Sequence, residues 1–390
     1  RFTSSAQHEF ISHGGGSASG NNEILVDGAS VVMPRQGGSI AASPSGDAVE
    51  EVRVQTTMFD AAFGRTNGGV VSYATRSGSN ELHGSFEGFY RNRSLEANTW
   101  TNNRNGLPRP NIKRRFYSGA IGGPIYLPKL YDGRNRTFFF VSVQKENIQT
   151  GSTYLNRTFT DLERRGDFSQ TLNAQGTPLA VYDPFSTVVS GSTATRRQFA
   201  GNRIPASMFN EPGSAIANVF PLPTLSVAPR VGLQNWALVT EDRVPGDQYT
   251  LRMDQMVSSR QRLFGRFGLM KHATYIGGIP PGLELAGEDF RNFYTASLND
   301  DYTFGPTSFA TFRYSFGRYS SDTFYSAQRQ DPKVLKLPDV LLRNAIFSSW
   351  PRIIMGENMV GTGGRVRYRA NDTHSLVPMF TKLAGRHNIR

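Results

Sequence analysis

The chain has 390 residues, of which 38% are hydrophobic and 12% aromatic, and it contains 40 glycines and no cysteine. This size allows two or three soluble domains or one large β architecture, and the missing cysteines exclude disulfides and thiolate metal sites. The net charge of +12 would suit a polyanion, but the basic residues recur in loops and at strand ends, so we expect no nucleic-acid partner.

The first 80 residues predict a small mixed α/β or β-rich unit. Residues 24–26 form a short strand that ends in the tight-turn signal Asp27-Gly28. Residues 47–56 begin like a capped helical turn and continue as a strand, and residues 64–75 read as a turn followed by a strand.

Glycines and an asparagine mark the end of this unit. Gly68, Gly69 and Gly78 are expected to supply positive φ angles or a close approach between backbones. Residues 77–80, which end in Asn80, are expected to link the unit to the segment that follows.

From residue 81 onward the chain alternates between apolar and polar positions. In this stretch one face carries Leu82, Gly84, Phe86, Gly88 and Tyr90, and the other carries His83, Ser85, Glu87 and Arg91. Period two over about ten residues is typical of a transmembrane β-strand, although a half-buried strand of a soluble sandwich gives the same pattern. The densest apolar run, residues 138–143, is far shorter than the ~18 residues that a helical span requires. The candidate strands are residues 81–92, 114–126, 136–147, 247–257, 261–272, 292–304, 308–319 and 373–384.

The connections between these strands alternate in length. The short ones are residues 127–135, 258–260, 305–307 and 384–387, and the long ones are residues 93–113, 148–246, 273–291 and 320–372. A transmembrane barrel has tight turns on one side and long loops on the other, whereas a soluble sandwich has no reason to sort its loops in this way. Loops of about 100 and about 50 residues are also abnormal inside a compact domain.

The two faces of such a barrel differ, because the lumen face is polar and the outer face is apolar. The side chains expected to point inward are Arg252, Asp254, Arg313 and Glu87. The side chains expected near two aromatic girdles are Tyr90, Phe116, Tyr302 and Phe304. A soluble core would use the same aromatic residues, but it would not explain the alternating loop lengths.

Motifs for catalysis fail on inspection. His8 and His13 are five positions apart and do not share a helix face, which argues against a zinc site of the H-E-x-x-H type. Residues 13–16, HGGG, resemble an oxyanion motif, but the chain has no G-x-S-x-G elbow and no P-loop. We therefore expect no catalytic residue, no metal, no cofactor and no enzymatic activity.

Several runs carry a family resemblance. They are NNEILVDGASV, DAVEEVRVQTTMFDAAFGRTNGGVVSYATRSGSNELHGSFEGFYRN, FYSGAIGGPI, YDGRNRTFFFVSVQ, the L-R-M-D strand and HSLVPMFTKLAGRHNIR. Through these runs, which spread from about residue 22 to residue 390, the chain resembles the TonB-dependent outer-membrane transporters, particularly the Oar-like group abundant in Acidobacteria. The similarity is weaker over residues 160–240.

The resemblance implies an all-β fold in the bacterial outer membrane, a transmembrane antiparallel β-barrel with a small α/β plug inside. Residues 1–80 would be the C-terminal part of the plug, and residues 81–390 would hold about eight of the family's 22 strands. The chain would then be a fragment, which cannot close around a plug, and which lacks the segment contacted by a TonB-type energy-coupling protein. Its other expected partners are outer-membrane lipid and an extracellular substrate that is bound by loops and plug and then imported.

The resemblance also assigns roles to particular residues. The plug and its seat in the barrel would depend on Asp27, Gly28, Glu50, Glu51, Arg65, Gly68, Gly69, Gly78 and Asn80. Glu50 and Glu51, with Arg53 and Arg65, either form ion pairs between plug and wall or remain solvated. The loop tryptophans that either stack on a ligand or pack locally are Trp100, Trp236 and Trp350.

Two other functions fit parts of the sequence. The first is a surface adhesion or assembly protein that uses the same barrel and its long loops without uptake. The second is a soluble, basic, β-rich protein that binds polysaccharide or nucleic acid. Substrate accumulation that depends on the proton-motive force separates import from adhesion, and a need for detergent during extraction eliminates the soluble protein.

Overall fold

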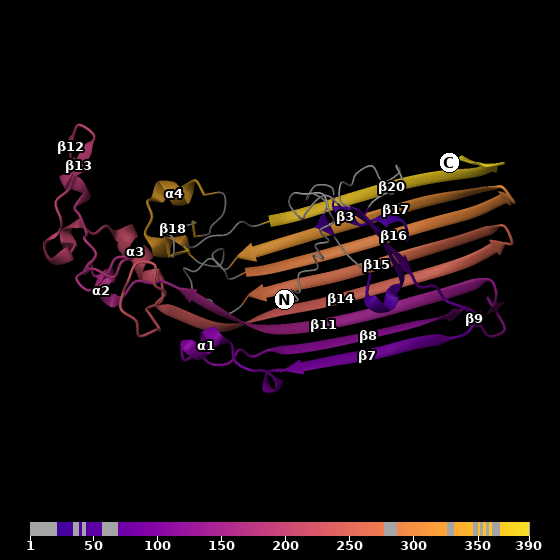
Figure 1. Ribbon diagram of the computed structural model, residues 1–390, viewed down its shortest axis with the longest axis horizontal. Coiled ribbons are helices and arrows are strands. Elements are labelled where there is room, and N and C mark those ends of the chain that lie inside the picture. The colour runs from indigo at the N-terminus through magenta and orange to yellow at the C-terminus, as the bar shows by residue number, and fades with distance from the viewer. Residues whose placement is uncertain are drawn as a thin grey trace.

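The computed structural model describes residues 22–33, 39–40, 44–56, 69–276, 287–325, 331–345, 350–351, 354–355, 359–360 and 367–389. Its main feature is a curved antiparallel sheet of nine strands, here called the wall, in the order β21-β20-β17-β16-β15-β14-β11-β8-β7 (Figure 1). The strands are β7 (His83–Asn92), β8 (Lys113–Pro124), β11 (Thr137–Asn156), β14 (Trp236–Ser258), β15 (Gln261–Ile276), β16 (Gly287–Gly305), β17 (Ser308–Tyr325), β20 (Arg367–Ala384) and β21 (His387–Ile389). Among the described residues β7 and β21 remain separate edges, so the predicted partial β-barrel is confirmed.

All eight candidate strands are present, but the boundaries of the long loops were wrong. β11 and β14 pair without a break up to Asn156 and Trp236, so residues 148–156 and 236–246 are strands rather than loop. Strands β15, β16, β17 and β20 also extend into the predicted loops 273–291 and 320–372. Backbone hydrogen bonds pair these extensions residue by residue, and their sequences show little apolar–polar alternation.

Short and long connections lie at opposite ends of the wall, as the loop lengths predicted. The links 259–260, 306–307 and 385–386 lie at the right-hand end in Figure 1. The hairpin β9 (Tyr126–Leu127) and β10 (Tyr131–Asp132) lies at the same end. The left-hand end carries the short helices α1 (Trp100–Arg104), α2 (Asp161–Arg164), α3 (Glu211–Val219) and α4 (Asp339–Arg343). No helix in the described part of the chain is long and apolar enough to cross a membrane.

The two faces of the wall have the opposite polarity to that of a soluble protein, with apolar side chains exposed and polar side chains buried. One face exposes large apolar side chains, which include Phe86, Tyr117, Leu251, Met253, Phe267, Leu298, Phe304, Phe312, Leu376 and Phe380. The opposite face buries polar ones, which include Ser118, Ser142, Thr250, Arg252, Asp254, Arg266, Thr295, Ser297 and Asn299. Strand register places each set on one side, because residues directly opposite each other point the same way. A soluble protein does the reverse, whereas a membrane barrel has an apolar outside and a polar inside.

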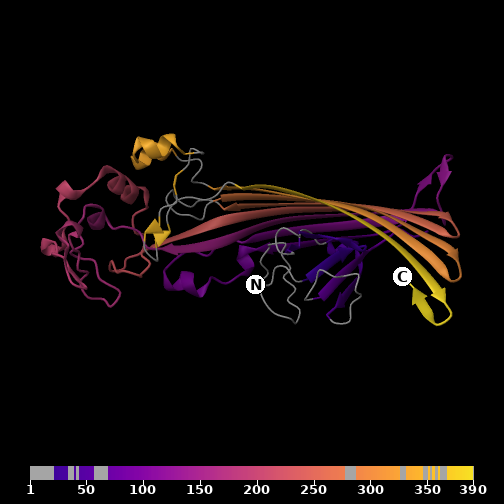
Figure 2. The same ribbon diagram turned by 90° about the horizontal axis from the view of Figure 1, so that it is seen from above.

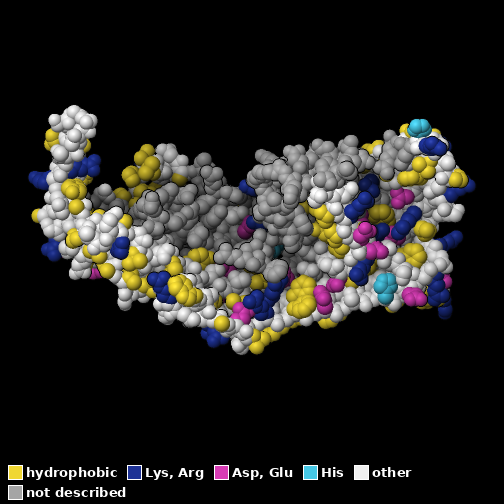
Figure 3. Space-filling model, in the orientation of Figure 1, with side chains coloured by type: hydrophobic (Ala, Val, Ile, Leu, Met, Phe, Trp, Pro, Cys, Tyr) yellow, Lys and Arg dark blue, Asp and Glu magenta, His cyan; other side chains and the backbone are white. Residues whose placement is uncertain are grey.

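A small mixed sheet lies against the polar face of the wall (Figure 2). Its order is β2-β1-β6-β5, with β1 (Asn22–Val26) parallel to β6 (Gly69–Thr75). The other two strands are β2 (Ala29–Ser30) and β5 (Val49–Gln55), and a further hairpin pairs β3 (Val32–Met33) with β4 (Ser39–Ile40). The predicted helical turn before β5 is a 3₁₀ turn, Gly46–Ala48. Figure 3, drawn from the side that carries this small sheet, shows Lys, Arg, Asp and Glu side chains over the strands beside it.

One aromatic residue predicted for the outer face lies on the inner one. Phe116 is directly opposite Phe89, with ring centroids 5.8 Å apart. It shares its face with Ser118, which contacts Asp47 next to the small sheet. The adjacent Tyr117 points outward instead and is 51% exposed. Two neighbouring aromatic residues in a strand always point to opposite faces, and the sequence pattern had favoured the wrong one of the pair.

Candidate functional site between the small sheet and the wall

Asp27 occupies a turn that aims its carboxylate at the wall. Asp27 and Gly28 join β1 to β2 as a two-residue hairpin with φ of 49° and 77°, the conformation for which Asp-Gly is favoured. The carboxylate accepts hydrogen bonds from Thr75, at 2.9 Å from the backbone N and 2.7 Å from the hydroxyl. Thr75, which belongs to the same small sheet, thereby holds both carboxylate oxygens in position without any contact from the wall.

Two wall arginines share this carboxylate. Arg252 Nη1 lies 3.4 Å from Asp27 Oδ1 and donates to the Thr75 carbonyl at 2.8 Å. Arg266 Nε lies 3.1 Å from Asp27 Oδ2, and this ion pair lacks hydrogen-bond geometry. The side chains of Asp27, Arg252 and Arg266 are 4%, 8% and 4% exposed, so little solvent screens the charges.

A second carboxylate, that of Asp254, holds Arg252 in place. Asp254 accepts two hydrogen bonds from Arg252, at 2.8 and 3.0 Å, and a third from Arg262 at 2.8 Å. The Arg252 guanidinium also lies over the Phe264 ring at 4.3 Å from its centroid. These wall contacts pre-orient Arg252 toward the small sheet.

Gly28 allows a third arginine to approach. Arg313 donates to the Gly28 carbonyl at 3.3 Å and to Asn299 Oδ1 at 2.7 Å. A Cβ atom at Gly28 would overlap the Arg313 guanidinium, and the positive φ already disfavours a side chain there. We call the set Asp27, Gly28, Thr75, Arg252, Asp254, Arg266 and Arg313 the latch.

Apolar and hydroxyl contacts flank the latch. A buried cluster joins Ile24, Val26, Val31 and Val71 of the N-terminal part to Met270, Phe293 and Tyr319 of the wall. Nearby, the hydroxyls of Ser45 and Ser142 are hydrogen-bonded at 2.8 Å.

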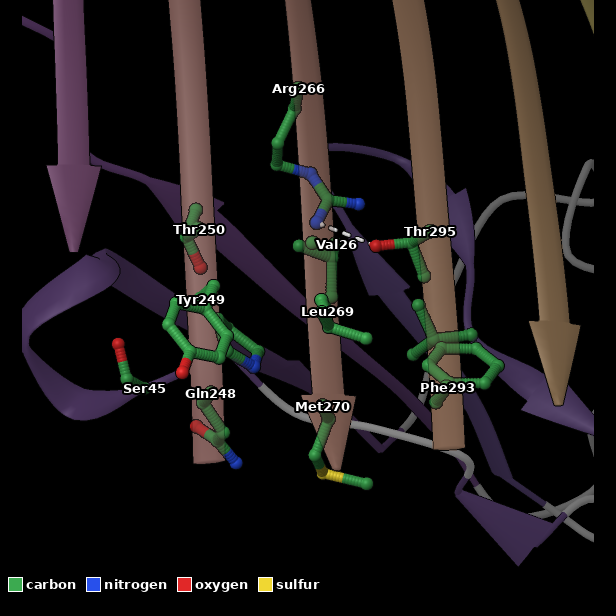
Figure 4. Close-up of a pocket in the computed structure, with 13 residues that line it drawn as sticks. Val26, Ser45, Gln248, Tyr249, Thr250, Arg266, Leu269, Met270, Phe293 and Thr295 are labelled. Carbon is green, nitrogen blue, oxygen red and sulfur yellow. Dashed lines mark hydrogen bonds between the residues drawn. The ribbon is translucent and has the colours of Figure 1, made fainter. Parts of the chain in front are cut away.

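Next to this cluster lies a cavity of about 30 Å³, whose lining includes Val26, Ser45, Gln248, Met270 and the Arg266 guanidinium (Figure 4). Arg266 donates to the Thr295 hydroxyl at 3.2 Å, while its Nη2 and the Gln248 Oε1 are buried without a hydrogen-bond partner among the described residues. Around Arg266 the interface is thus polar, and two of its buried polar atoms lack a hydrogen-bond partner among the described residues.

The other residues predicted for the N-terminal part have mixed positions. Glu50 and Glu51 are exposed and form no salt bridge within the described residues, so the expected ion pairs to the wall are made by Asp27 instead. Arg65 and Gly68 lie outside the described residues, and Gly69 begins β6.

The linker glycine and asparagine both contact the wall. A side chain at Gly78 would collide with the carbonyl oxygen of Phe139, which requires glycine at this position. Asn80 Nδ2 donates to Asn135 Oδ1 at 2.5 Å, and Asn135 N donates to Asn80 Oδ1 at 2.7 Å. This reciprocal pair ties the linker to the turn before β11.

The three tryptophans do not form one ligand-binding surface. Trp236 is 3% exposed in a cluster with Phe220, and Trp350 is 4% exposed and donates to the Asp331 carbonyl at 2.8 Å. Both pack locally, so the expectation that they stack on a ligand was wrong. Trp100 alone is open, at 72% exposure, with Arg104 over its ring at 5.2 Å.

The roles of Thr75 and Arg266 were not predicted from the sequence. A signal does exist for Arg266, because strand register places it directly opposite Arg252 on the inner face. Two arginines side by side on the polar face require a carboxylate from another element. Within the described residues no group of three His, Asp or Glu side chains is placed to hold a metal ion.

Comparison with known proteins gives matches of three kinds. The family model described as "Outer membrane beta barrel domain" matches residues 74–390. The TonB-dependent transporter Oar of Myxococcus xanthus is 36% identical over 121 residues, which are 30% of this chain and 11% of that protein. The outer membrane transporter YddB from Escherichia coli superimposes with a TM-score of 0.50 at 12% identity, over 93% of this chain and 38% of the YddB chain. The last match supports the fold alone.

Proposed function

Since the chain belongs to the outer-membrane β-barrel family and therefore resides in the bacterial outer membrane, we propose that it is part of a substrate-uptake receptor. In this proposal residues 1–80 are plug and residues 81–390 are barrel wall. The matched transporter Oar is TonB-dependent by name, which supports the same mode of energy supply here. Membership of this family excludes the soluble polysaccharide-binding alternative.

The observation that carries the proposal is the latch. A barrel that served only for adhesion would not need a separate small sheet seated against its inner face by buried arginines. The latch is made of ion pairs and hydrogen bonds to Asp27, Gly28 and Thr75, and water can replace each of these contacts when the sheet moves. If the interface were apolar and of equal size, water could not replace its contacts in this way.

The wall is built to stay intact while the latch opens. For example, β11 and β14 pair over their full common length, from Thr137 opposite Gln255 to Asn156 opposite Trp236. Each wall strand is held by hydrogen bonds along its whole length, whereas the small sheet contacts the wall mainly through side chains. Force applied to the N-terminal part by an energy-coupling protein would therefore displace the small sheet first.

Substrate capture belongs to the end with the long connections. Two of these connections pack together there, because Leu335 and Trp350 contact Ile216 and Val219 of α3. Lys336 adds an ion pair to Glu211 at 3.7 Å. The joined connections form a stable outer structure, and the exposed Trp100 is the aromatic side chain that we propose for contact with a substrate.

The test is uptake by cells that carry the intact protein. We expect labelled substrate to accumulate only while the proton-motive force is maintained, and to remain bound at the surface when an uncoupler is added. Accumulation that is absent under both conditions, with surface binding retained, would favour adhesion instead.

A further inference from the structure

Two phenylalanines lie side by side on the inner face of the wall, where most side chains are polar. Phe89 of β7 and Phe116 of β8 are directly opposite each other, with ring centroids 5.8 Å apart. Phe89 is 62% exposed, whereas the inner-face Phe140 is 2% exposed. Contact with lipid does not explain an exposed aromatic pair on this face, because lipid reaches only the outer face.

The pair lies just beyond the small sheet, on the side of the long connections. Ser118 is two positions from Phe116 on β8 and contacts the Asp47 carboxylate beside the small sheet. From Ser118 to Phe116 the strand leads back toward the connection 93–112, and two residues rise ~7 Å. A molecule that enters from this end therefore meets the pair before it reaches the small sheet.

Carboxylates lie on the side of the pair that is nearer the small sheet. Glu87 precedes Phe89 by two positions on the same face of β7, and strand register places it directly opposite Ser118. Glu87 is exposed and forms no salt bridge within the described part of the chain. Together with Asp47, which contacts Ser118, it gives this side of the pair a negative charge.

Arginines lie on the other side of the pair. Arg91 and Arg114 are directly opposite each other, two positions beyond the phenylalanines. Arg91 pairs with Glu96 through Nε, and Arg114 Nε donates to Glu146 at 2.8 Å. The two arginine side chains remain 60% and 41% exposed. Because a guanidinium has five N–H donors, both can still bind a further carboxylate.

The order along β7 is thus acid, ring and base, over a length that matches a short peptide. Glu87 and Arg91 are four residues apart, which is ~13 Å, and Phe89 lies midway. An extended tripeptide spans ~10 Å and a tetrapeptide ~13 Å. The ammonium group of such a peptide would face Glu87, its carboxylate would face the arginines, and its middle side chain would lie on the rings.

The balance of charge around the pair argues against other ligand classes. Glu146 is directly opposite Phe116, and His272 lies in the same row of the inner face, two strands further on. Glu87, Glu96 and Glu146 place three carboxylates against two guanidiniums, so a strongly negative ligand is repelled. A neutral sugar would stack on the rings but would leave both charged sides without a partner.

We propose that the site formed by Glu87, Phe89, Arg91, Arg114 and Phe116 binds a short peptide that has free termini and an aromatic side chain. The peptide's ring packs against the phenylalanine rings, and its two termini form charge-assisted hydrogen bonds at either side. This inference rests on the proposed uptake function, because it names the class of substrate that would be imported.

The test measures binding of the tripeptide Ala-Phe-Ala to the purified intact protein in mild detergent by titration calorimetry. The variant F89S/F116S is expected to bind it about tenfold more weakly. Phe89→Ser alone changes an exposed position, covers the case in which the double variant does not fold, and should weaken binding about threefold. The control Phe185→Ser, which removes a ring that is 87% exposed between β11 and β14, should leave binding unchanged.

Capped peptides test how the two termini are bound. N-acetyl-Ala-Phe-Ala and Ala-Phe-Ala amide should each bind about tenfold more weakly than the free tripeptide. Glu87→Gln should weaken binding of the free tripeptide and leave binding of the acetylated one unchanged. A general loss of fold would weaken both.

Equal binding of the free and capped tripeptides, or unchanged binding in the folded Phe89 variants, would overturn the proposal. If the protein binds no tripeptide but accumulates another molecule under a proton-motive force, the peptide class is wrong and the uptake function stands. Binding of the tripeptide without accumulation would support the site and count against uptake.

Discussion

Asp27→Ala should release the small sheet from the wall while the wall remains folded. The substitution removes the carboxylate that faces Arg252 and Arg266, both nearly buried. Loss of one partner of a buried ion pair costs ~3–5 kcal/mol, because the remaining charge is left uncompensated. Asp27 also accepts two hydrogen bonds from Thr75, so we expect the upper part of this range.

Maleimide labelling of a cysteine at Ser45 measures the release. Ser45 is 3% exposed at the interface, and the chain has no native cysteine to compete. Labelling then requires local opening, and its rate follows the population of the open form. A cost of ~3–5 kcal/mol corresponds to labelling that is faster by about a hundredfold to several thousandfold.

Glu51→Ala is the matched control. Glu51 is an exposed carboxylate of the same small sheet and has no salt bridge within the described residues, so its loss should leave the labelling rate unchanged. Adding Arg266→Met to Asp27→Ala should recover part of the stability, because it removes the stranded charge. Equal labelling rates in the Asp27 and Glu51 variants would refute the latch.

Gly28→Ala should weaken the seating of the small sheet by ~1–3 kcal/mol, because the residue has a φ of 77° and faces a guanidinium; labelling as slow as in the parent protein would contradict this. Leu298→Arg, in the apolar band of the outer face, should cost ~2–4 kcal/mol of folding free energy in liposomes, and Ser320→Arg, next to the charged outer-face pair of Arg318 and Asp372, ~0–1 kcal/mol. Urea titration measures both, and equal costs would show that the band is misplaced. Trp236→Ala should cost ~3–5 kcal/mol and open residues 157–235 to proteolysis, whereas Trp100→Ala should weaken substrate binding alone. Proteolysis that is the same in both tryptophan variants would contradict this assignment.

The strands of the wall were predictable because lipid constrains every second residue. Positions such as Leu251 and Met253 must be apolar to face lipid, while Arg252 between them faces inward, and this contrast is visible in the sequence. The same strands continue beyond the lipid, where water reaches both faces and any polar residue is accepted. Residues 148–156 therefore looked like loop, although they pair along their full length.

The latch was only half predictable, because its two sides are far apart in the chain. The Asp-Gly turn is a local signal, and it correctly marked Asp27 and Gly28. Their partner Arg252 is 225 positions away, and no local pattern relates such distant residues. Trp236 was misjudged for a similar reason, because the cluster that buries it includes Phe220 and Tyr154, which are distant from it in the sequence.

The most direct test of the central claim is a disulfide between the small sheet's side of the interface and the wall. The Ser45 and Ser142 hydroxyls are 2.8 Å apart, so S45C/S142C places two sulfurs within bonding reach. A matched control, S297C/S315C, joins directly opposite residues of β16 and β17 within the wall. Both pairs are introduced into a chain without other cysteines.

We predict that oxidised S45C/S142C binds substrate at the cell surface and imports none, and that a reductant restores import. Oxidised S297C/S315C should import substrate at the rate of the parent protein. Import by oxidised S45C/S142C at the parent rate would contradict the account, because the small sheet could then not be the element that moves.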